Sequence, residues 1–182
     1  MKNASNTEAM TAAKTPVITP TKTSFALHHI PCGVRARVLD IFLSISHAIA
    51  ADLTALEALA RDFARTLQAG DVVALRGELG SGKTTFVAAV VRALGGTTDV
   101  ASPTFTFWHR YAGAPPVEHL DLYRIDSPAE ARELGLDEAL AAGSIVFVEW
   151  PDRLPGFIPA HAIGVTLMGS GDAARHLTIV RP

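Results

Sequence analysis

The glycine-rich stretch at residues 77–84 constrains the fold of this chain more than any other segment. It reads Gly-Glu-Leu-Gly-Ser-Gly-Lys-Thr and matches the pattern G-x-x-x-x-G-K-[ST] at every fixed position. The apolar run 71–76 precedes it, and residues 84–94 follow as a predicted helix that ends before Gly95. A buried strand, a glycine-rich loop and a helix in this order predict a phosphate-binding loop, or P-loop.

The residues of this loop have separate expected tasks. Gly77, Gly80 and Gly82 let the backbone turn and bring N–H groups against phosphate oxygens, where the following helix also directs its positive end. Lys83 is the only lysine after residue 22, whereas twelve arginines occur there. We therefore expect Lys83 to reach the β- and γ-phosphates of a nucleotide and the Thr84 hydroxyl to bind Mg²⁺.

Length and charge indicate one acidic domain. The 182 residues are 48% apolar, which is enough for a single packed core. We predict a disordered extension over residues 1–37 and a P-loop ATPase domain over residues 38–182. Residues 51–182 hold eleven Lys and Arg against sixteen Asp and Glu. Because this body lacks the basic surface that gripping nucleic acid requires, we expect a partner to hold any RNA.

The cysteine content and the N-terminal composition predict a cytoplasmic protein. Cys32 is the only cysteine, so no intramolecular disulfide forms, which fits a reducing compartment. No apolar stretch reaches the length of a membrane span, so we expect no membrane association. Residues 1–25 lack the apolar segment of a secretory signal.

The remaining segments predict an α/β fold. Residues 38–49 suggest an edge strand through the alternation of Leu43, Ile45, His47 and Ile49, and residues 52–69 suggest an amphipathic helix. The order of elements predicts a three-layer α/β/α sandwich of the P-loop NTPase type, with a mostly parallel sheet and a C-terminal antiparallel hairpin. Further predicted strands are 106–111, 117–123, 145–149, 162–167 and 176–180, and Ser127 is a predicted helix N-cap.

Two carboxylates are candidates for the chemistry beside the P-loop. Glu149 ends the apolar run 145–149, which is the Walker B pattern with Glu in place of the more usual Asp, and we expect it to hold Mg²⁺ with Thr84. Asp121 alternates with His119 and Tyr123 along the predicted strand, where it would orient a water or act as its base. The alternative for that strand is an edge position with a solvated polar face.

Other residues near these carboxylates leave their roles open. Ser102-Pro103-Thr104-Phe105 reads either as a switch-like loop, with Thr104 sensing the γ-phosphate through Mg²⁺, or as an ordinary turn. Trp150 either shields the site from water or packs as a wall. His119 reads as structural, because no other His or Cys stands at metal-ligand spacing.

Four motifs in order carry a family resemblance. They are the P-loop at 77–85, SPTF at 102–105, HLDLYR at 119–124 and VEWP at 148–151. Together they resemble the TsaE (YjeE) family, small bacterial ATPases of tRNA threonylcarbamoyladenosine biosynthesis, over about residues 42–181. The P-loop alone is widespread, whereas the ordered set of four is specific.

The resemblance implies a function and a set of partners. Members bind ATP with Mg²⁺, hydrolyse it slowly when alone and work with the TsaB and TsaD proteins. These partners transfer a threonylcarbamoyl group to adenosine 37 of ANN-decoding tRNAs, and the hydrolysis resets their complex between turnovers. Carried over to this chain, Gly80, Ser81, Gly82, Lys83, Thr84 and Thr85 hold phosphates, Thr84 and Glu149 hold Mg²⁺, Asp121 and Thr104 support hydrolysis, and Thr54 and Arg175 lie near the nucleotide.

The chain departs little from the family pattern, and two other functions stay open. Ser81 stands where Ala is commoner and Glu78 where Asp is commoner, and neither change removes a needed group. A small-molecule kinase would use the same P-loop, but its arginine-bearing lid is missing because Arg110, Arg124 and Arg132 are scattered. The second alternative is a nucleotide-dependent assembly switch that does not hydrolyse ATP.

Overall fold

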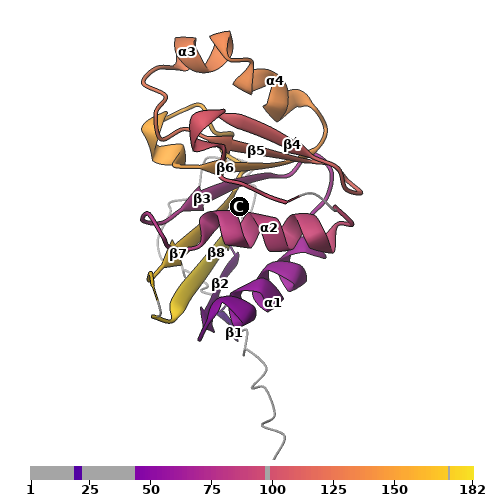
Figure 1. Cartoon of the computed structure of the whole chain (residues 1–182), viewed down its shortest axis with the longest axis vertical. Helices are drawn as coiled ribbons and strands as arrows, with labels where there is room; N and C mark the ends of the chain where they lie inside the picture. Colours follow the sequence, from indigo (N-terminus) through magenta and orange to yellow (C-terminus); the bar gives the residue numbers. More distant parts are fainter. Residues whose placement is uncertain (1–18, 22–43, 97–98, 172) are drawn as a thin grey trace, which may run out of the picture.

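The computed structural model describes residues 19–21, 44–96, 99–171 and 173–182 (Figure 1). Cys32 and residues 38–43 of the predicted first strand lie outside these ranges. The strands of the described part are β1 (Thr19–Thr21), β2 (Ser44–Ala50), β3 (Val72–Arg76), β4 (Trp108–Tyr111), β5 (Val117–Asp121), β6 (Ile145–Glu149), β7 (Ile163–Met168) and β8 (Arg175–Arg181).

These strands form one sheet across the described residues, in the order β1-β2-β8-β7-β3-β6-β5-β4. The four middle strands β7, β3, β6 and β5 pair in parallel. β7 and β8 form the predicted antiparallel hairpin, which β2 and β1 extend, and β4 pairs antiparallel with β5. The α/β fold, with its parallel middle and C-terminal hairpin, is therefore confirmed.

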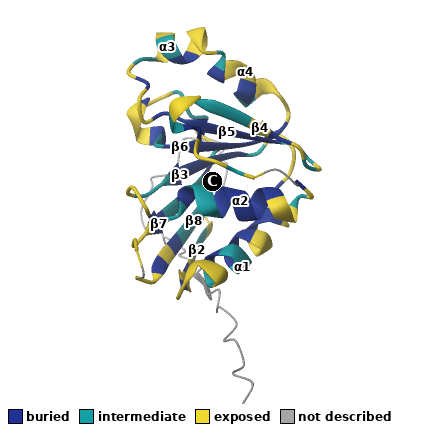
Figure 2. Cartoon of the chain, in the orientation of Figure 1, coloured by how far each residue is buried: buried dark blue, intermediate teal, exposed yellow. Residues whose placement is uncertain are grey.

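Helices cover both faces of the parallel strands, as Figures 1 and 2 show. All five residues of β6 are buried because alternate side chains enter two different cores. Helices α1 (Leu53–Ala64) and α2 (Lys83–Ala93) cover one face of the sheet, and α3 (Pro128–Glu133) and α4 (Leu136–Ala141) cover the other (Figure 1). Ile145 and Phe147 belong to the core beneath α1 and α2, whereas Val146 and Val148 belong to the core beneath α3 and α4.

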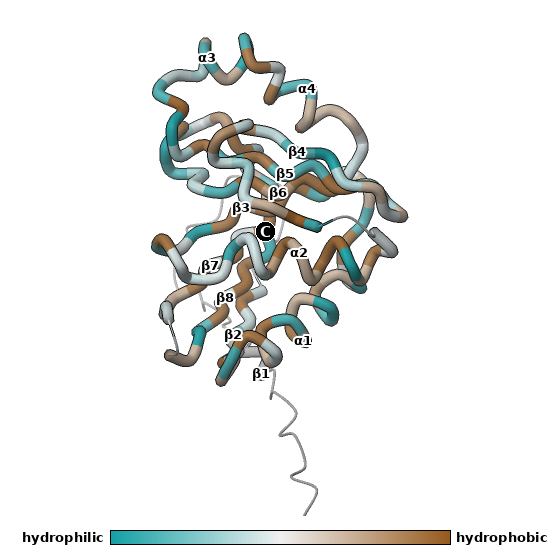
Figure 3. The backbone as a smooth tube through the Cα atoms, in the orientation of Figure 1, coloured by the Kyte–Doolittle hydropathy of each residue, from teal (hydrophilic) through white to brown (hydrophobic). Residues whose placement is uncertain are grey.

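Apolar residues concentrate in these central strands and on the inner faces of the helices (Figure 3). Within the described ranges, no helix combines the length and the apolar character needed to cross a membrane.

Helix α1 begins as predicted and ends earlier than predicted. The Asp52 side chain caps it by accepting a hydrogen bond from the Ala55 N–H at 2.8 Å. The helix ends at Ala64, so the predicted continuation to residue 69 is wrong. The backbone N–H and the hydroxyl of Thr66 both donate to the Phe63 carbonyl, at 2.9 and 2.7 Å, and this local bonding turns the chain away from the helix.

The first predicted strand differs in its position within the sheet. In the described chain β2 lies between β1 and β8, so it is not the edge strand. Its buried residues are Ala48 and Ala50, which join the core that α1 covers, whereas Ile49 is 58% exposed. β1 comes from the stretch 1–37, and its pairing with β2 is recorded for residues 19–21. The domain boundary at residue 37 stays a prediction.

Candidate functional site

The P-loop joins β3 to α2 through a backbone that needs glycine at its first position. Gly77 has a φ of 143°, and a Cβ there would lie 2.4 Å from the Leu167 carbonyl oxygen and 2.7 Å from Ser81 Oγ. Any side chain at residue 77 would therefore collide with β7 and with the loop itself. Gly82, also at positive φ, caps α2 and directs the helix N-terminus toward the loop interior.

Lys83 places a cation at the centre of this loop. It begins α2, is only 5% exposed and donates from Nζ to the carbonyls of Gly77 at 2.9 Å and Glu78 at 3.1 Å. Its Nζ also lies 3.9 Å from Glu149 Oε2. Burial lowers the pKa of Lys83 below its ordinary value, while the negative charges of Glu149 and Asp121 oppose that shift.

Thr84 and Glu149 meet as the Walker pattern predicts. The Thr84 hydroxyl donates to Glu149 Oε1 at 3.1 Å, and the Glu149 side chain is buried. Among the described residues no three His, Cys, Asp or Glu side chains gather into a metal cluster. One hydroxyl and one carboxylate fit Mg²⁺, which usually takes its remaining ligands from water and nucleotide phosphates.

Asp121 and the loop at 102–105 also come together. Thr104 Oγ1 donates to Asp121 Oδ2 at 2.6 Å, and the Tyr123 N–H donates to Oδ1 at 2.8 Å. Arg124 Nε holds the loop by donating to the Thr104 carbonyl at 2.8 Å. Asp121 is 2% exposed and β5 lies between β6 and β4, so the solvated edge strand that the sequence left open is excluded.

These groups border an open pocket of about 340 Å³ beside the P-loop. Eight of the twelve predicted site residues line it. They are Gly80, Gly82, Lys83, Thr84, Thr85, Thr104, Glu149 and Arg175, and the other lining residues are Leu53, Leu79, Ser102 and Trp150.

The other four predicted site residues do not line the pocket. Gly77 and Asp121 accept hydrogen bonds from residues that do, namely Lys83 and Thr104. Ser81 is almost fully buried, and its Oγ has no hydrogen-bond partner among the described residues. Thr54 is exposed in the first turn of α1, and its neighbour Leu53 lines the pocket in its place.

Arg175, the first residue of β8, brings a second buried cation to the pocket. It is 4% exposed, and its Nη1 donates to the Ala173 carbonyl at 2.8 Å. Its Nε has no partner, and none of the ion pairs within the described residues includes it. Because a buried charge without a counter-charge is costly, this guanidinium favours an anionic ligand in the pocket.

Two further neighbours of the site stand outside the twelve predicted site residues, because the sequence interpretation read His119 as structural and left the role of Trp150 open. His119 Nε2 lies 2.9 Å from Glu149 Oε1, and Trp150 lies over Lys83, with Nζ 4.2 Å from the ring centroid. Trp150 also packs against Tyr123 at 5.0 Å between ring centroids. The alternation of polar residues in 119–123 did mark the face of the strand, but the partner of His119 depends on how β5 pairs with β6.

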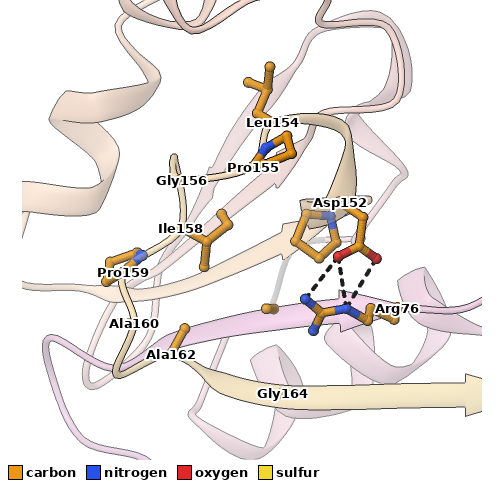
Figure 4. Close-up of a pocket in the computed structure, with 12 residues that line it drawn as sticks. Arg76, Asp152, Leu154, Pro155, Gly156, Ile158, Pro159, Ala160, Ala162 and Gly164 are labelled. Carbon is orange, nitrogen blue, oxygen red and sulfur yellow. Dashed lines mark hydrogen bonds and ion pairs between the residues drawn. The ribbon is translucent and has the colours of Figure 1, made fainter.

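A second hollow, of about 330 Å³, lies over β3 and β7 (Figure 4). Arg76 and Asp152 pair at its mouth through hydrogen bonds of 3.0 and 3.1 Å, and both side chains are substantially exposed. Its other lining residues are prolines, glycines and small or aliphatic side chains. None of the twelve predicted site residues lines it.

Comparisons with known proteins identify the family of this chain. A family model described as "Threonylcarbamoyl adenosine biosynthesis protein TsaE" matches residues 50–177. The tRNA threonylcarbamoyladenosine biosynthesis protein TsaE of Bacillus subtilis is 37% identical over 123 residues, covering 67% of this chain and 77% of that protein. The protein of the same name from Nostoc sp. is 40% identical over 119 residues, covering 63% and 72%.

A solved structure shares both sequence and fold. The crystal structure of Bacillus subtilis YdiB matches with a TM-score of 0.65 at 29% identity, and the match covers 76% of this chain and 86% of that one. The family model spans more than half of the chain, including every predicted site residue. The chain therefore belongs to the TsaE family of threonylcarbamoyl adenosine biosynthesis proteins.

Proposed function

We propose that this chain is a Mg²⁺-dependent ATPase that acts with the TsaB and TsaD proteins to form the threonylcarbamoyl modification on adenosine 37 of ANN-decoding tRNAs. Family membership supports the pathway. The observation that carries the ATPase proposal is the convergence of Lys83, Thr84 and Glu149 within one pocket beside the P-loop.

Nucleotide binding uses the two buried cations and the helix N-terminus. Lys83 and the backbone N–H groups at the start of α2 receive the phosphates, and Arg175 supplies further positive charge from β8. Thr84 and Glu149 hold the metal ion. When bound, Mg²⁺ would neutralise the charge that develops on the phosphate oxygens during transfer.

Hydrolysis needs a group that orients the attacking water. Asp121 suits this task because its Oδ2 is bonded to the Thr104 hydroxyl, which lines the pocket, so the carboxylate acts on the pocket through Thr104. Trp150 forms one wall and limits the access of bulk water to Lys83.

The rim of the pocket supports the proposed partnership with other proteins. Exposed large apolar side chains gather at the carboxyl ends of the parallel strands, namely Leu53, Leu79, Phe105, Tyr123 and Met168. Such side chains around a polar pocket favour a protein partner that covers the rim. The acidic body agrees with tRNA being held by that partner.

A reconstituted modification assay with TsaB, TsaD, tRNA and ATP tests the proposal. We expect Lys83→Ala and Glu149→Ala to abolish multiple turnover, because the first removes the phosphate-binding cation and the second a metal ligand. A loss of about 10²–10³-fold is typical for one group that stabilises the charge of a transition state. Arg92→Ala is the matched control, since it removes a positive charge from the far end of the same helix.

Full multi-cycle activity of Lys83→Ala or Glu149→Ala would refute the proposal. A phosphorylated metabolite in place of free phosphate, when the protein is incubated with ATP and a metabolite mixture, would instead support the kinase alternative.

A further inference from the structure

His119 occupies a position that nucleotide binding alone does not explain. Its side chain is fully buried within β5, with Nε2 2.9 Å from Glu149 Oε1. The other ring nitrogen, Nδ1, is buried and has no hydrogen-bond partner in the described part of the chain. The ring is therefore bonded on one side only, and that side faces the carboxylate that would hold the metal.

The chemistry of this contact assigns the ring proton. An ionised carboxylate accepts hydrogen bonds and cannot donate them, so Nε2 carries the hydrogen in its bond to Glu149. Nδ1 is then a bare acceptor. A hydrogen at Nδ1 would instead leave a buried N–H without a partner, which costs free energy.

We propose that His119, as the Nε2–H tautomer, is a positioning residue that holds the Glu149 carboxylate in its metal-binding orientation. This inference rests on the proposed function, since it assumes that Thr84 and Glu149 bind Mg²⁺. Glu149 Oε1 receives hydrogen bonds from both Thr84 and His119, and Oε2 faces Lys83 at 3.9 Å.

Of the three side chains that contact the Glu149 carboxylate, His119 is the one best placed to orient it. Lys83 already donates to the carbonyls of Gly77 and Glu78, so its hold on Glu149 is a longer ionic contact. Thr84 must turn its oxygen lone pairs toward a metal while its hydrogen points at Glu149. His119 approaches from the neighbouring strand and is outside the pocket lining, so a ligand can fill the pocket without displacing it.

The affinity for ATP with Mg²⁺ and with excess chelator separates this role from simple packing. Hydrogen-bond partners of metal ligands typically change metal affinity or activity by about 10–100-fold. Mg²⁺ should raise the ATP affinity of the unmodified protein, and we expect this increase to be about 10–100-fold smaller in His119→Leu. The ATP affinity measured with excess chelator should be the same in both proteins. His119→Gln places an amide N–H at the reach of Nε2, and we expect it to retain most of the gain.

Nitrogen NMR on the Mg²⁺-free, full-length protein gives a readout that is independent of activity and of binding. The His119 ring, assigned by the signal that disappears in His119→Gln, should show the Nε2–H tautomer, and its N–H signal should move in Glu149→Gln. A hydrogen at Nδ1 would overturn the inference, even if His119→Leu failed to fold.

The outcomes distinguish this inference from the proposed function. If Mg²⁺ does not raise the ATP affinity of the unmodified protein, the proposed function fails. If Mg²⁺ does raise it and His119→Leu keeps the full gain, only the role of His119 is overturned. Equal loss in His119→Leu and His119→Gln would also overturn it, because the donor would then not matter.

Discussion

Two hollows of nearly equal volume differ in how their charges are buried. The P-loop pocket, of about 340 Å³, is lined by Lys83, Glu149 and Arg175, each at most 5% exposed. The hollow in Figure 4, of about 330 Å³, has Arg76 and Asp152, whose side chains are 42% and 72% exposed. The two hollows therefore differ in the burial of their charged side chains and not in their volume.

The physical reason lies in the cost of desolvation. An exposed ion pair such as Arg76–Asp152 exchanges water for a partner at little net gain. A buried charge must be compensated, and the P-loop pocket contains more positive groups than its own carboxylates neutralise at close range. An anionic ligand would complete this pocket, while the second hollow has no comparable deficit.

Of the changes that test the contrast between the two hollows, the largest effect is expected at Asp121, next to the P-loop pocket. We expect Asp121→Asn to lower the rate of ATP hydrolysis by about 10²–10⁴-fold, the range of a lost general base. Nucleotide affinity should be retained, because Asp121 does not line the pocket. Steady-state phosphate release and equilibrium nucleotide binding measure the two effects, and normal tRNA modification by a variant that no longer hydrolyses ATP would favour the assembly switch.

A smaller effect is expected from Arg175, the buried cation that forms no ion pair within the described residues. Replacing Arg175 by Met keeps an apolar side chain of similar length but removes hydrogen bonds to a charged ligand, so nucleotide affinity should fall by about 10–100-fold. Calorimetric titration measures this, with Arg181→Met at the other end of β8 as the control. Without nucleotide, the free energy of unfolding should not fall, because an uncompensated charge leaves the interior. Unchanged affinity would contradict the role of Arg175.

The smallest effect is expected in the second hollow. Asp152→Asn breaks an exposed ion pair with Arg76, so the free energy of unfolding should change by less than about 1 kcal/mol. The rate of ATP hydrolysis should stay that of the unmodified protein. Chemical denaturation and phosphate release measure these quantities, and a hydrolysis defect as large as that of Asp121→Asn would remove the contrast between the two hollows.

Much of the fold was predictable because its signals are local. The predicted strand 145–149 has the bounds of β6, and Ser127 caps α3 by accepting from the Glu130 N–H at 3.2 Å, as its motif indicates. The end of α1 was not predictable from periodicity, because the bonds from Thr66 to the Phe63 carbonyl compete with the helix. The buried face of β2 was not apparent from the alternation, because the residues that join the core are the small Ala48 and Ala50, whereas the larger Ile49 is exposed.

The sequence by itself determined the P-loop, because Gly77, Lys83 and Thr84 act within one short turn whose conformation depends on adjacent residues. It also identified Asp121 and Glu149 as strand-end carboxylates. The Walker pattern also predicted that Thr84 meets Glu149, and only the tertiary structure decided how the other side chains reach this pair. The parallel register of β5 with β6 sets Asp121 level with Glu149 and brings His119 to that carboxylate, and the C-terminal hairpin delivers Arg175. Such contacts depend on how strands that are distant in the sequence pair and pack, and no local sequence pattern specifies that pairing.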